Sequence, residues 1–251
     1  MPIILSNITT PLIGIVDTAV LGQLEGAHHI GAAALGGTIF TFLFWAFGFL
    51  RMGTTGLTAQ AFGADNPREV SASLARALMI AALAGGILVL LQWPLGFAAL
   101  ALIDGSEAVI AGTSDYFSNR IWSAPAALAN YALVGWLIGL QRARTALFLQ
   151  LFLNCLNAAL DILVVLGFGW GVAGVALGTV IAEVSAAIAG LAVAVTILQR
   201  SYVLPQRADV TDAIGLRRLL SVNADIMIRT LALLAAFSWF TFQSAPSGDA
   251  T

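Results

Sequence analysis

The chain has 251 residues, of which 59% are hydrophobic and only 10% are charged, and its formal net charge is −2. Soluble domains carry roughly 25% charged residues, so a large soluble core does not explain this composition. The net charge is too small to imply nucleic acid or an acidic partner, so we expect no nucleic acid, and the single cysteine excludes an intrachain disulfide and a cysteine-based metal cluster. The composition therefore predicts an all-α, polytopic membrane protein whose surroundings are a lipid bilayer.

Apolar windows of about 20 residues, the length that crosses a bilayer as a helix, recur along the chain. We expect six membrane helices, at residues 2–24, 30–52, 72–93, 107–140, 144–167 and 172–198. Residues 95–103 are apolar but too short to span, so we expect them at the membrane interface. The predicted organisation is a six-helix unit at 1–198, a linker at 199–217 and the beginning of a second unit, with a seventh apolar segment, at 218–251.

The arginines predict the orientation, because the chain contains no lysine and cytoplasmic loops are rich in positive charge. Alternate predicted connections carry Arg51, Arg68 and Arg76, then Arg142 and Arg144, then Arg200, Arg207, Arg217 and Arg218. The remaining connections carry acids and histidines, and no arginine apart from Arg120, which we expect at the beginning of the fourth helix. This alternation supports six crossings before residue 199 and predicts a cytoplasmic N-terminus.

The first cytoplasmic loop is expected at residues 56–70, and it ends in a helix start. Asn66 is a good side-chain cap, and Pro67 suits the first helical position. Glu69 places a carboxylate three residues beyond the cap. These residues are explained by a capped turn and do not require a ligand.

The first predicted helix carries an acid close to a potential bend. Asp17 follows Pro11, which removes a backbone hydrogen bond and can bend the helix. A bendable helix with a titratable group suits a proton-coupled transporter, whereas the alternative is a static kink with a carboxylate that faces the surface.

The fifth predicted helix contains the most informative polar residues. Asn154, Asn157 and Asp161 are spaced by three and four residues, so they share one helical face. A carboxylate at a membrane-helix centre costs about 2.5–3.5 kcal/mol, which makes Asp161 a candidate functional residue. The asparagines alone have a structural alternative, because such residues also join membrane helices by hydrogen bonds.

The sixth predicted helix adds a third embedded acid, Glu183, with Thr179 one turn before it. Arginines are expected only near helix ends, so these acids have no obvious permanent countercharge. Together they indicate a membrane protein that handles protons or other cations.

No Ser/His/Asp set, metal-ligand spacing or phosphate-binding glycine loop is evident, so we expect neither an enzyme, nor a cofactor, nor a metal site. The glycine run through Gly174 and Gly178 suits close helix packing.

Five segments together resemble the multidrug and toxic compound extrusion (MATE) family, in its DinF-like bacterial branch. They are SNITTPLIGIVDTAVLG, LRMGTTGLTAQAFGADNP, WSAPAALANYALVGWLIGLQRAR, NAALDILVVLGFGWGVAGVALGTVIAE and LRRLLSVNADIMIRT, and they run through nearly the whole chain. The resemblance implies a twelve-helix antiporter of two six-helix lobes in the bacterial cytoplasmic (inner) membrane. Such carriers export organic, often cationic, small molecules against an inward flow of protons or sodium ions.

The resemblance also implies a cation site in the first lobe, made of Asp17, Asn130, Asn157, Asp161 and Thr179. Secondary candidates are Asn154, Glu183 and the possible hinge Pro11, together with Pro2, which matches the proline that is associated with bending of helix one in this family. Between the two coupling ions, we expect H+ rather than Na+.

Twelve helices need nearly twice this length, so we expect an N-terminal half: a six-helix N-lobe and part of helix seven. Alternating access requires two halves, so a missing C-terminal lobe is the expected partner, and this chain alone is not expected to transport. Two alternatives stay open. A lipid-linked sugar flippase of the same superfamily would need a basic central cavity. The acids and the absence of lysine argue against this alternative. In a non-transporting membrane scaffold, the buried polar residues would only fasten helices together.

Overall fold

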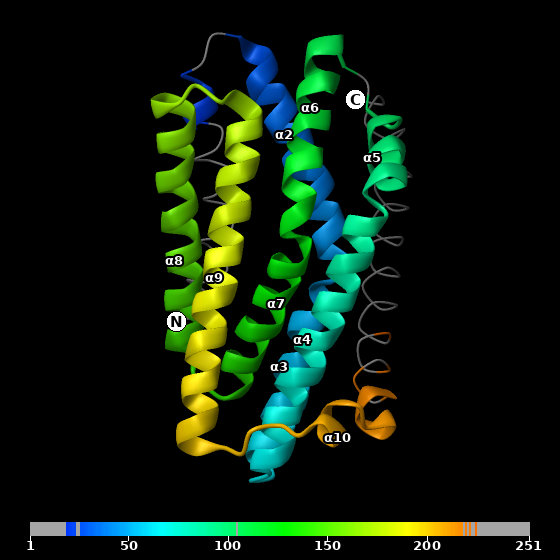
Figure 1. The fold of residues 1–251 in the computed structure, drawn as a ribbon, viewed down its shortest axis with the longest axis vertical. Helices are drawn as coiled ribbons and strands as arrows, with labels where there is room; N and C mark the ends of the chain where they lie inside the picture. Colours follow the sequence, from blue (N-terminus) through cyan, green and yellow to red (C-terminus); the bar gives the residue numbers. More distant parts are fainter. Residues whose placement is uncertain are drawn as a thin grey trace, which may run out of the picture.

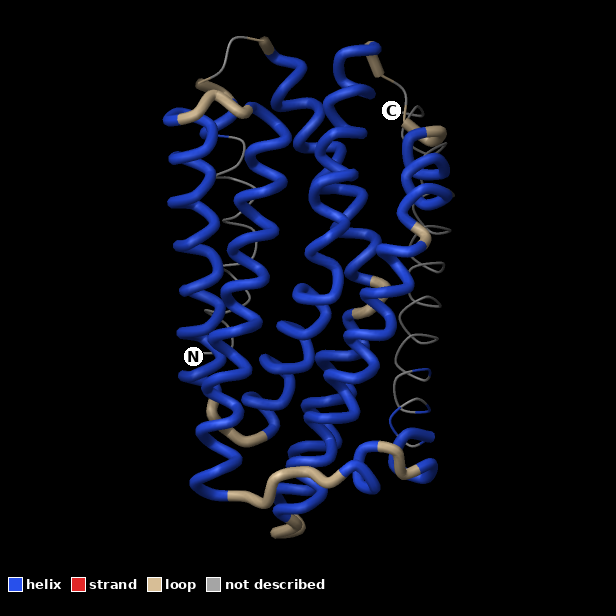
Figure 2. The backbone as a smooth tube through the Cα atoms, in the orientation of Figure 1, coloured by secondary structure: helices blue, strands red, loops and turns tan. Residues whose placement is uncertain are grey.

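The computed structural model describes residues 19–23, 26–103, 105–217, 219, 221 and 224. Over these ranges the chain is helical, without a strand (Figure 2). Asp17, Pro2 and Pro11 lie outside the described residues, as does most of the predicted seventh segment. Of the first predicted helix, residues 19–21 are described as helical.

The longer helices lie side by side along one axis (Figure 1). They are α2 (Ala27–Trp45), α3 (Gly48–Gly63), α4 (Pro67–Leu90), α6 (Glu107–Arg120), α7 (Ala124–Gly139), α8 (Ala143–Asp161) and α9 (Gly171–Ser201), with the shorter α5 (Gln92–Leu100) and α10 (Arg207–Val210). A 3-10 turn, η1 (Ile121–Ser123), joins α6 to α7, and a π-helical segment, η2 (Ile162–Gly167), extends α8.

Five stretches of the described chain are long and apolar enough to cross a membrane. They are His28–Gly63, Pro67–Leu90, Glu107–Gly139, Ala143–Gly167 and Gly171–Arg200. These stretches correspond to the second to sixth predicted helices, and α5 corresponds to the short apolar segment. The prediction of an all-α membrane bundle is confirmed.

The loop predicted at residues 56–70 is wrong for most of its length. Helix α3 continues to Gly63 and α4 begins at Pro67, which leaves a three-residue turn. The polar sequence is compatible with a helix because its hydroxyls are used between helices: Thr58 shares a 3.0 Å hydrogen bond with Ser73 of α4. The predicted cap is confirmed, since Asn66 Oδ1 accepts a 3.0 Å hydrogen bond from the Glu69 backbone N–H.

The connections that carry arginine lie at one end of the bundle, the lower end in Figure 1. The α3–α4 turn, the α7–α8 turn and the linker after α9 meet at this end, whereas the α5–α6 and η2–α9 connections lie at the other. However, Arg51 belongs to α3 and Arg76 to α4, so neither lies in a connection. Arg120 is the last residue of α6 and lies near the middle of the span Glu107–Gly139.

Glycines allow the helices to approach closely. A side-chain carbon at Gly135 of α7 would lie 2.5 Å from the carbonyl oxygen of Arg51 in α3. A carbon at Gly174 of α9 would lie 2.6 Å from Val164 in η2, and one at Gly178 would lie 2.6 Å from Asp161 Oδ1. Gly174 and Gly178 therefore have the helix-packing role that their spacing predicts.

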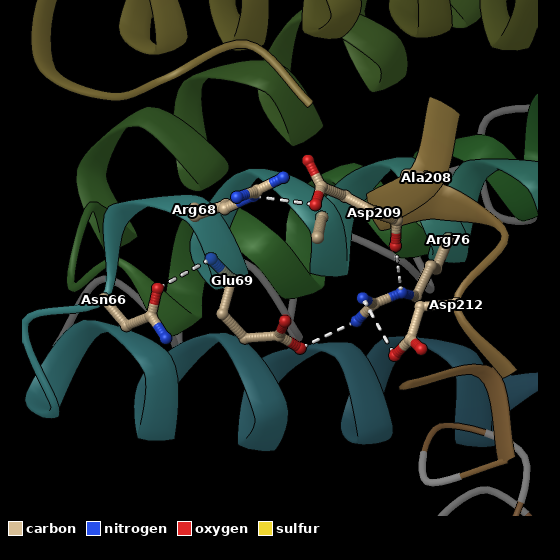
Figure 3. Close-up of a pocket in the computed structure, with 8 residues that line it drawn as sticks. Asn66, Arg68, Glu69, Arg76, Ala208, Asp209 and Asp212 are labelled. Carbon is tan, nitrogen blue, oxygen red and sulfur yellow. Dashed lines mark hydrogen bonds and ion pairs between the residues drawn. The ribbon is translucent and has the colours of Figure 1, made fainter. Parts of the chain in front are cut away.

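The segment after α9 is held against the start of α4 by ion pairs of Arg68 with Asp209 and of Arg76 with Asp212 (Figure 3). Arg68 Nε donates a 2.7 Å hydrogen bond to Asp209 Oδ1. The buried Arg76 donates to Glu69 Oε1 at 2.7 Å and to the backbone oxygen of Asp209 at 2.9 Å, and it lies 3.9 Å from Asp212 Oδ2. We call this set, Arg68, Glu69, Arg76, Asp209 and Asp212, the linker clasp.

Two further features fit the linker to Arg76. Gly215 packs directly on the guanidinium group, where a side-chain carbon would overlap it. A hydrogen bond from the backbone N–H of Gln206, together with the bond from Arg68, holds the pKa of Asp209 below its ordinary value of 3.8. The clasp therefore keeps Asp209 negatively charged down to a lower pH than an ordinary aspartate.

Candidate functional site

A buried acid group lies where α8 and η2 pack against α9. We use this name for Asp161, Asn157 and Thr179, whose side chains are all 0% exposed. Asn157 Nδ2 donates a 3.1 Å hydrogen bond to Thr179 Oγ1, and the Thr179 hydroxyl donates to the backbone oxygen of Val175 at 3.0 Å. Two of these three predicted site residues, Asn157 and Thr179, therefore contact each other directly across facing helices.

Asp161 occupies a special position within this group. It is the last residue of α8, and the π-helical η2 follows it immediately. Gly178 faces its carboxylate, and a side-chain carbon at Gly178 would lie 2.6 Å from Asp161 Oδ1, so the carboxylate would have to shift. Asn157 lies one turn earlier, and its Oδ1 is buried without a hydrogen-bond partner among the described residues. Carboxylate and amide oxygens one turn apart can take up a proton or coordinate a hard cation.

A second feature is an open-sided cavity of about 800 Å3, whose lining includes the exposed Thr38, Trp45 and Met52. Its walls come from α2, α3, α6, α7, α8 and α9. Its described lining is rich in aromatic and apolar residues, and the charged residues among them are Arg51, Arg120 and Glu183. The volume is within the range of pockets that hold drug-sized molecules, roughly 300–1,000 Å3.

Arg120 and Glu183 form an ion pair on the wall of this cavity. Arg120 Nη2 lies 3.3 Å from Glu183 Oε1, and Arg120 Nη1 donates to the Tyr116 hydroxyl at 2.8 Å. The guanidinium carbon also lies 5.3 Å from the centre of the Phe40 ring, a cation–π distance. Asn130 Nδ2 donates to the Glu183 backbone oxygen at 2.9 Å.

The expectation that Glu183 lacks a permanent countercharge is therefore wrong. Arg120 was expected at a helix beginning, close to water. Because α6 continues through η1 into α7 as one span, Arg120 lies deep in the bundle instead. An arginine within a predicted span was the available sequence signal, and the same signal pointed to Arg51 in α3.

The structure divides the predicted site residues between these two places. Asp161, Asn157 and Thr179 form the buried acid group, whereas Asn130 and Glu183 line the cavity. Helix α9 connects them, since Thr179 and Glu183 lie one turn apart on it. Asn154 is half-buried in α8, outside the described lining of the cavity. Asp17, Pro2 and Pro11 remain outside the described residues.

Comparisons with known proteins agree with this architecture. The MatE family model matches residues 2–163. The chain is 43% identical over 249 residues to the DNA damage-inducible protein F of Escherichia coli (strain K12). This alignment covers 99% of this chain and 54% of that protein. It is 24% identical over 188 residues to the multidrug export protein MepA of Staphylococcus aureus (strain bovine RF122 / ET3-1), and this alignment covers 75% of this chain and 42% of that protein.

The fold is also similar to a solved structure described as the outward-facing conformation of a multidrug resistance MATE family transporter of the MOP superfamily. The TM-score is 0.85 at 18% identity, over 98% of this chain and 55% of that one. The chain spans about half the length of the curated relatives it matches. These findings confirm the predicted resemblance, including its DinF-like branch. The chain belongs to the MATE family, and it is a multi-pass membrane protein of a family whose members are transporters rather than enzymes.

Proposed function

We propose that this chain forms the first lobe of a cation-coupled antiporter that exports organic small molecules across the bacterial cytoplasmic membrane, with protons as the coupling ion. In this proposal residues 1–198 are the lobe, 199–217 the linker and 218–251 the beginning of a second lobe. The end of the bundle that carries Arg68, Arg142 and the linker faces the cytoplasm, together with the N-terminus.

The observation that carries the proposal is the complete burial of Asp161 between membrane helices. Keeping a carboxylate at such depth is costly, so intramembrane acids usually mark ion or proton pathways. Asp161 exchanges its charge by taking up and releasing a proton, and Asn157 and Thr179 fix the polar surroundings in which it does so. Asn130 was predicted in the same site as Asp161, but in this proposal it acts at the cavity and not beside Asp161.

Coupling acts through α9 in this mechanism, because the described lining of the cavity does not include Asp161. Gly178 leaves no spare room beside the carboxylate, so a change in its protonation shifts the packing of η2 against α9. π-helical segments often occur at functional sites, which fits a movable junction after Asp161. Glu183, one turn beyond Thr179, passes this shift to the cavity wall. Asp17 is the proposed second titratable group, and Pro2 or Pro11 the hinge of helix one.

The flippase is the second candidate, and a specific observation favours it. The sequence-based argument against it was that this half carries acids and no lysine, so that a basic central cavity was not expected. Arg51 and Arg120 line the cavity, so that argument no longer holds. The scaffold is the third possibility, and it requires only the hydrogen bonds between helices.

Transport in everted membrane vesicles tests these functions. The chain is expressed in an efflux-deficient strain, alone and together with the second half of the E. coli relative, and proton-driven dye export is measured in everted vesicles. Asp161→Asn is expected to reduce proton-driven export at least about tenfold. The matched control is Asp115→Asn, the same chemical change at an exposed position of α6, and it should export normally. Undiminished proton-driven export by Asp161→Asn contradicts the coupling role. Movement of a labelled lipid-linked sugar without dye export favours the flippase.

A further inference from the structure

Three helical paths of the described chain are interrupted between the two ends of the bundle. We call α2, α5 and α6 the outer half, which is the upper group in Figure 1, and α3, α4 and α7 the inner half, which is the lower group. We propose that the outer half bends as a unit against the inner half, and that the Arg120–Glu183 ion pair holds one position of this bend. The inference goes beyond the proposed export function, because it concerns a motion within one lobe.

Two of the breaks have prolines as their cause. Pro94 is the third residue of α5, and Pro125 is the second residue of α7. A proline cannot donate to the carbonyl four residues before it, and its ring clashes with that carbonyl, so the helix kinks there. These carbonyls belong to Leu90, the last residue of α4, and to Ile121, the first residue of η1. A 3-10 turn inside a helix, such as η1, often marks a hinge.

The third break separates α2 from α3 at Ala46 and Phe47. The Phe47 backbone N–H donates at 2.9 Å to the oxygen of Phe44, three residues earlier instead of four. Gly48 follows, with open space around it. This break therefore consists of a tightened turn next to a residue whose surroundings allow movement.

Contacts on both sides show that the α2–α3 and α6–α7 breaks are nearly level. In the outer half, Thr113 Oγ1 lies 3.4 Å from the backbone oxygen of Ala32, an offset of 81 residues. In the inner half, Thr55 Oγ1 donates to the Gly135 oxygen at an offset of 80. Because the two paths run in parallel with this nearly constant offset, the end of α2 lies within about one turn of η1.

The outer half is held together by close contacts. A side-chain carbon at Gly36 of α2 would overlap the Tyr116 ring of α6, and one at Gly96 of α5 would lie 3.0 Å from the Phe117 ring of α6. The Phe40 ring of α2 is stacked on that of Phe117, with 5.3 Å between ring centres. These three helices therefore fit one another as a unit.

The inner half is packed in the same way. A side-chain carbon at Gly85 of α4 would overlap the Pro125 backbone of α7. Trp136 Nε1 of α7 donates to the Val70 backbone oxygen of α4 at 2.9 Å. Helix α2 packs mainly on α6, whereas α3 packs mainly on α7 and α4. An apolar core that includes Ala81 crosses the breaks, so the halves bend about a shared contact and do not separate.

The ion pair connects the outer half to α9 directly at a break. Arg120 is the last residue of α6, next to η1, and its Nη2 lies 3.3 Å from Glu183 Oε1 of α9. Its guanidinium carbon lies 5.3 Å from the centre of the Phe40 ring of α2. Helix α9 is continuous from Gly171 to Ser201 and packs on both α6 and α7. The pair therefore fixes the end of the outer half to a helix that both halves contact.

The cavity lies beside two of the breaks. Its lining includes Trp45 and Gly48, on either side of the α2–α3 break, and Arg120 and Ala127, on either side of η1. A bend at these breaks therefore changes the shape of the cavity.

Distances between spin labels, measured by double electron–electron resonance, test the inference. The purified 251-residue chain is placed in nanodiscs and carries Cys155→Ser, so that introduced cysteines alone are labelled. The cross-break pair is Asp115→Cys in α6 with Ala59→Cys in α3. The within-half pairs are Asp115→Cys with Ala34→Cys in α2, and Ala59→Cys with Leu83→Cys in α4. All four positions are exposed.

Removal of the ion pair is expected to release the bend. Arg120→Gln with Glu183→Gln leaves no unpaired charge, and it should widen the cross-break distance distribution at least about twofold, because hinges at helix ends absorb the change. Both within-half distributions should stay unchanged. The matched control removes an ion pair of the linker clasp, far along the chain from the breaks, as Arg68→Gln with Asp209→Asn. It should leave all three distributions unchanged.

A proline variant tests the hinge without touching the ion pair. Pro125→Ala restores a backbone donor after η1, so it should narrow the cross-break distribution of the otherwise unmodified chain by at least about a third. The matched control is Pro67→Ala, at the first position of α4, where a proline interrupts no helix. Its distribution should be unchanged.

An unchanged cross-break distribution in either the ion-pair variant or Pro125→Ala would overturn the inference. Equal widening of the within-half distributions would also overturn it, because the lobe would then loosen throughout instead of bending. Circular dichroism verifies folding, and Pro125→Ala decides alone if the ion-pair variant does not fold. None of these results alters the outcome of the Asp161→Asn export test.

Discussion

Arg120 and Glu183 form an ion pair, 3.3 Å between Nη2 and Oε1, that joins α6 to α9 near the middle of the membrane-spanning helices. Both side chains are largely buried, and the Phe40 ring and Tyr116 hydroxyl complete the surroundings of the guanidinium. The pair is part of the cavity wall, and it lies one helical turn from Thr179 of the buried acid group. It therefore lies between the two places that the proposed mechanism couples.

Removal of one member of this pair is expected to destabilise the lobe. Glu183→Gln should lower the free energy of unfolding by roughly 3–5 kcal/mol, because a buried charge loses its partner. The double variant Arg120→Gln with Glu183→Gln should be closer to the unmodified protein, since no unpaired charge remains. Thermal unfolding of the variants in one detergent measures this. Equal losses in the single and double variants would contradict a direct pair.

The hydrogen bond from Asn157 distinguishes Thr179 from another threonine of α9. Thr179 and Thr196 both donate to the backbone oxygen four residues before them, but only Thr179 also accepts from Asn157. Thr179→Val should therefore cost about 1–3 kcal/mol of stability, because a buried amide loses its acceptor. Thr196→Val, at an exposed position, should change stability by less than about 0.5 kcal/mol. Similar unfolding temperatures for both variants would show that the buried contact contributes little.

A side chain at Gly178 is expected to destabilise the lobe. Gly178→Ala brings a methyl group against the Asp161 carboxylate, so we expect a loss of about 1–3 kcal/mol from overpacking. Gly86 of α4 has open space around it, and Gly86→Ala should be neutral or stabilising by up to about 1 kcal/mol, as helix propensity predicts. Chemical unfolding of both variants measures the difference. A neutral Gly178→Ala variant would rule out the tight contact with Asp161.

The linker clasp should respond to acid. Since the folded-state pKa of Asp209 is lowered, its contribution is fully present above its ordinary pKa of 3.8 and is lost as the pH falls through the lowered value. Hydrogen exchange of residues 203–217, corrected for the intrinsic effect of pH, should therefore accelerate on acidification. Asp209→Asn should show fast exchange already at neutral pH. Slow exchange in this variant would mean that the ion pair does not hold the linker.

The helices could be predicted because membrane spans depend mainly on the length of an apolar stretch, which is a local property. The predicted helix at 72–93 and the observed Pro67–Leu90 differ at their ends; at the first end, the polar Ser71 is compatible with a helix because its hydroxyl donates to the Pro67 backbone oxygen one turn earlier. The grouping of Asn157 and Asp161 also followed from spacing along one helix. By contrast, the pairing of Arg120 with Glu183 depends on residues 63 positions apart, which no local pattern indicates.

The separation of the acid from the cavity could not be predicted for the same reason. Asn130 and Asp161 were expected in one site, but Asn130 faces Glu183 across α7 and α9, whereas Asp161 packs on Gly178 between η2 and α9. Which faces of α9 meet which neighbours is decided by packing of whole helices. The residues were therefore predicted more successfully than their arrangement.

The most direct test of the coupling role of Asp161 is the number of protons exchanged when a probe binds. The chain in weakly buffered nanodiscs is mixed with ethidium, a cationic aromatic dye, as the probe, and a pH indicator reports proton release or uptake per bound probe. The account predicts measurable exchange that disappears in Asp161→Asn, with probe affinity preserved within about threefold, and that persists in Asp115→Asn. Proton exchange of unchanged size in Asp161→Asn would contradict the account, because another group would then carry the proton.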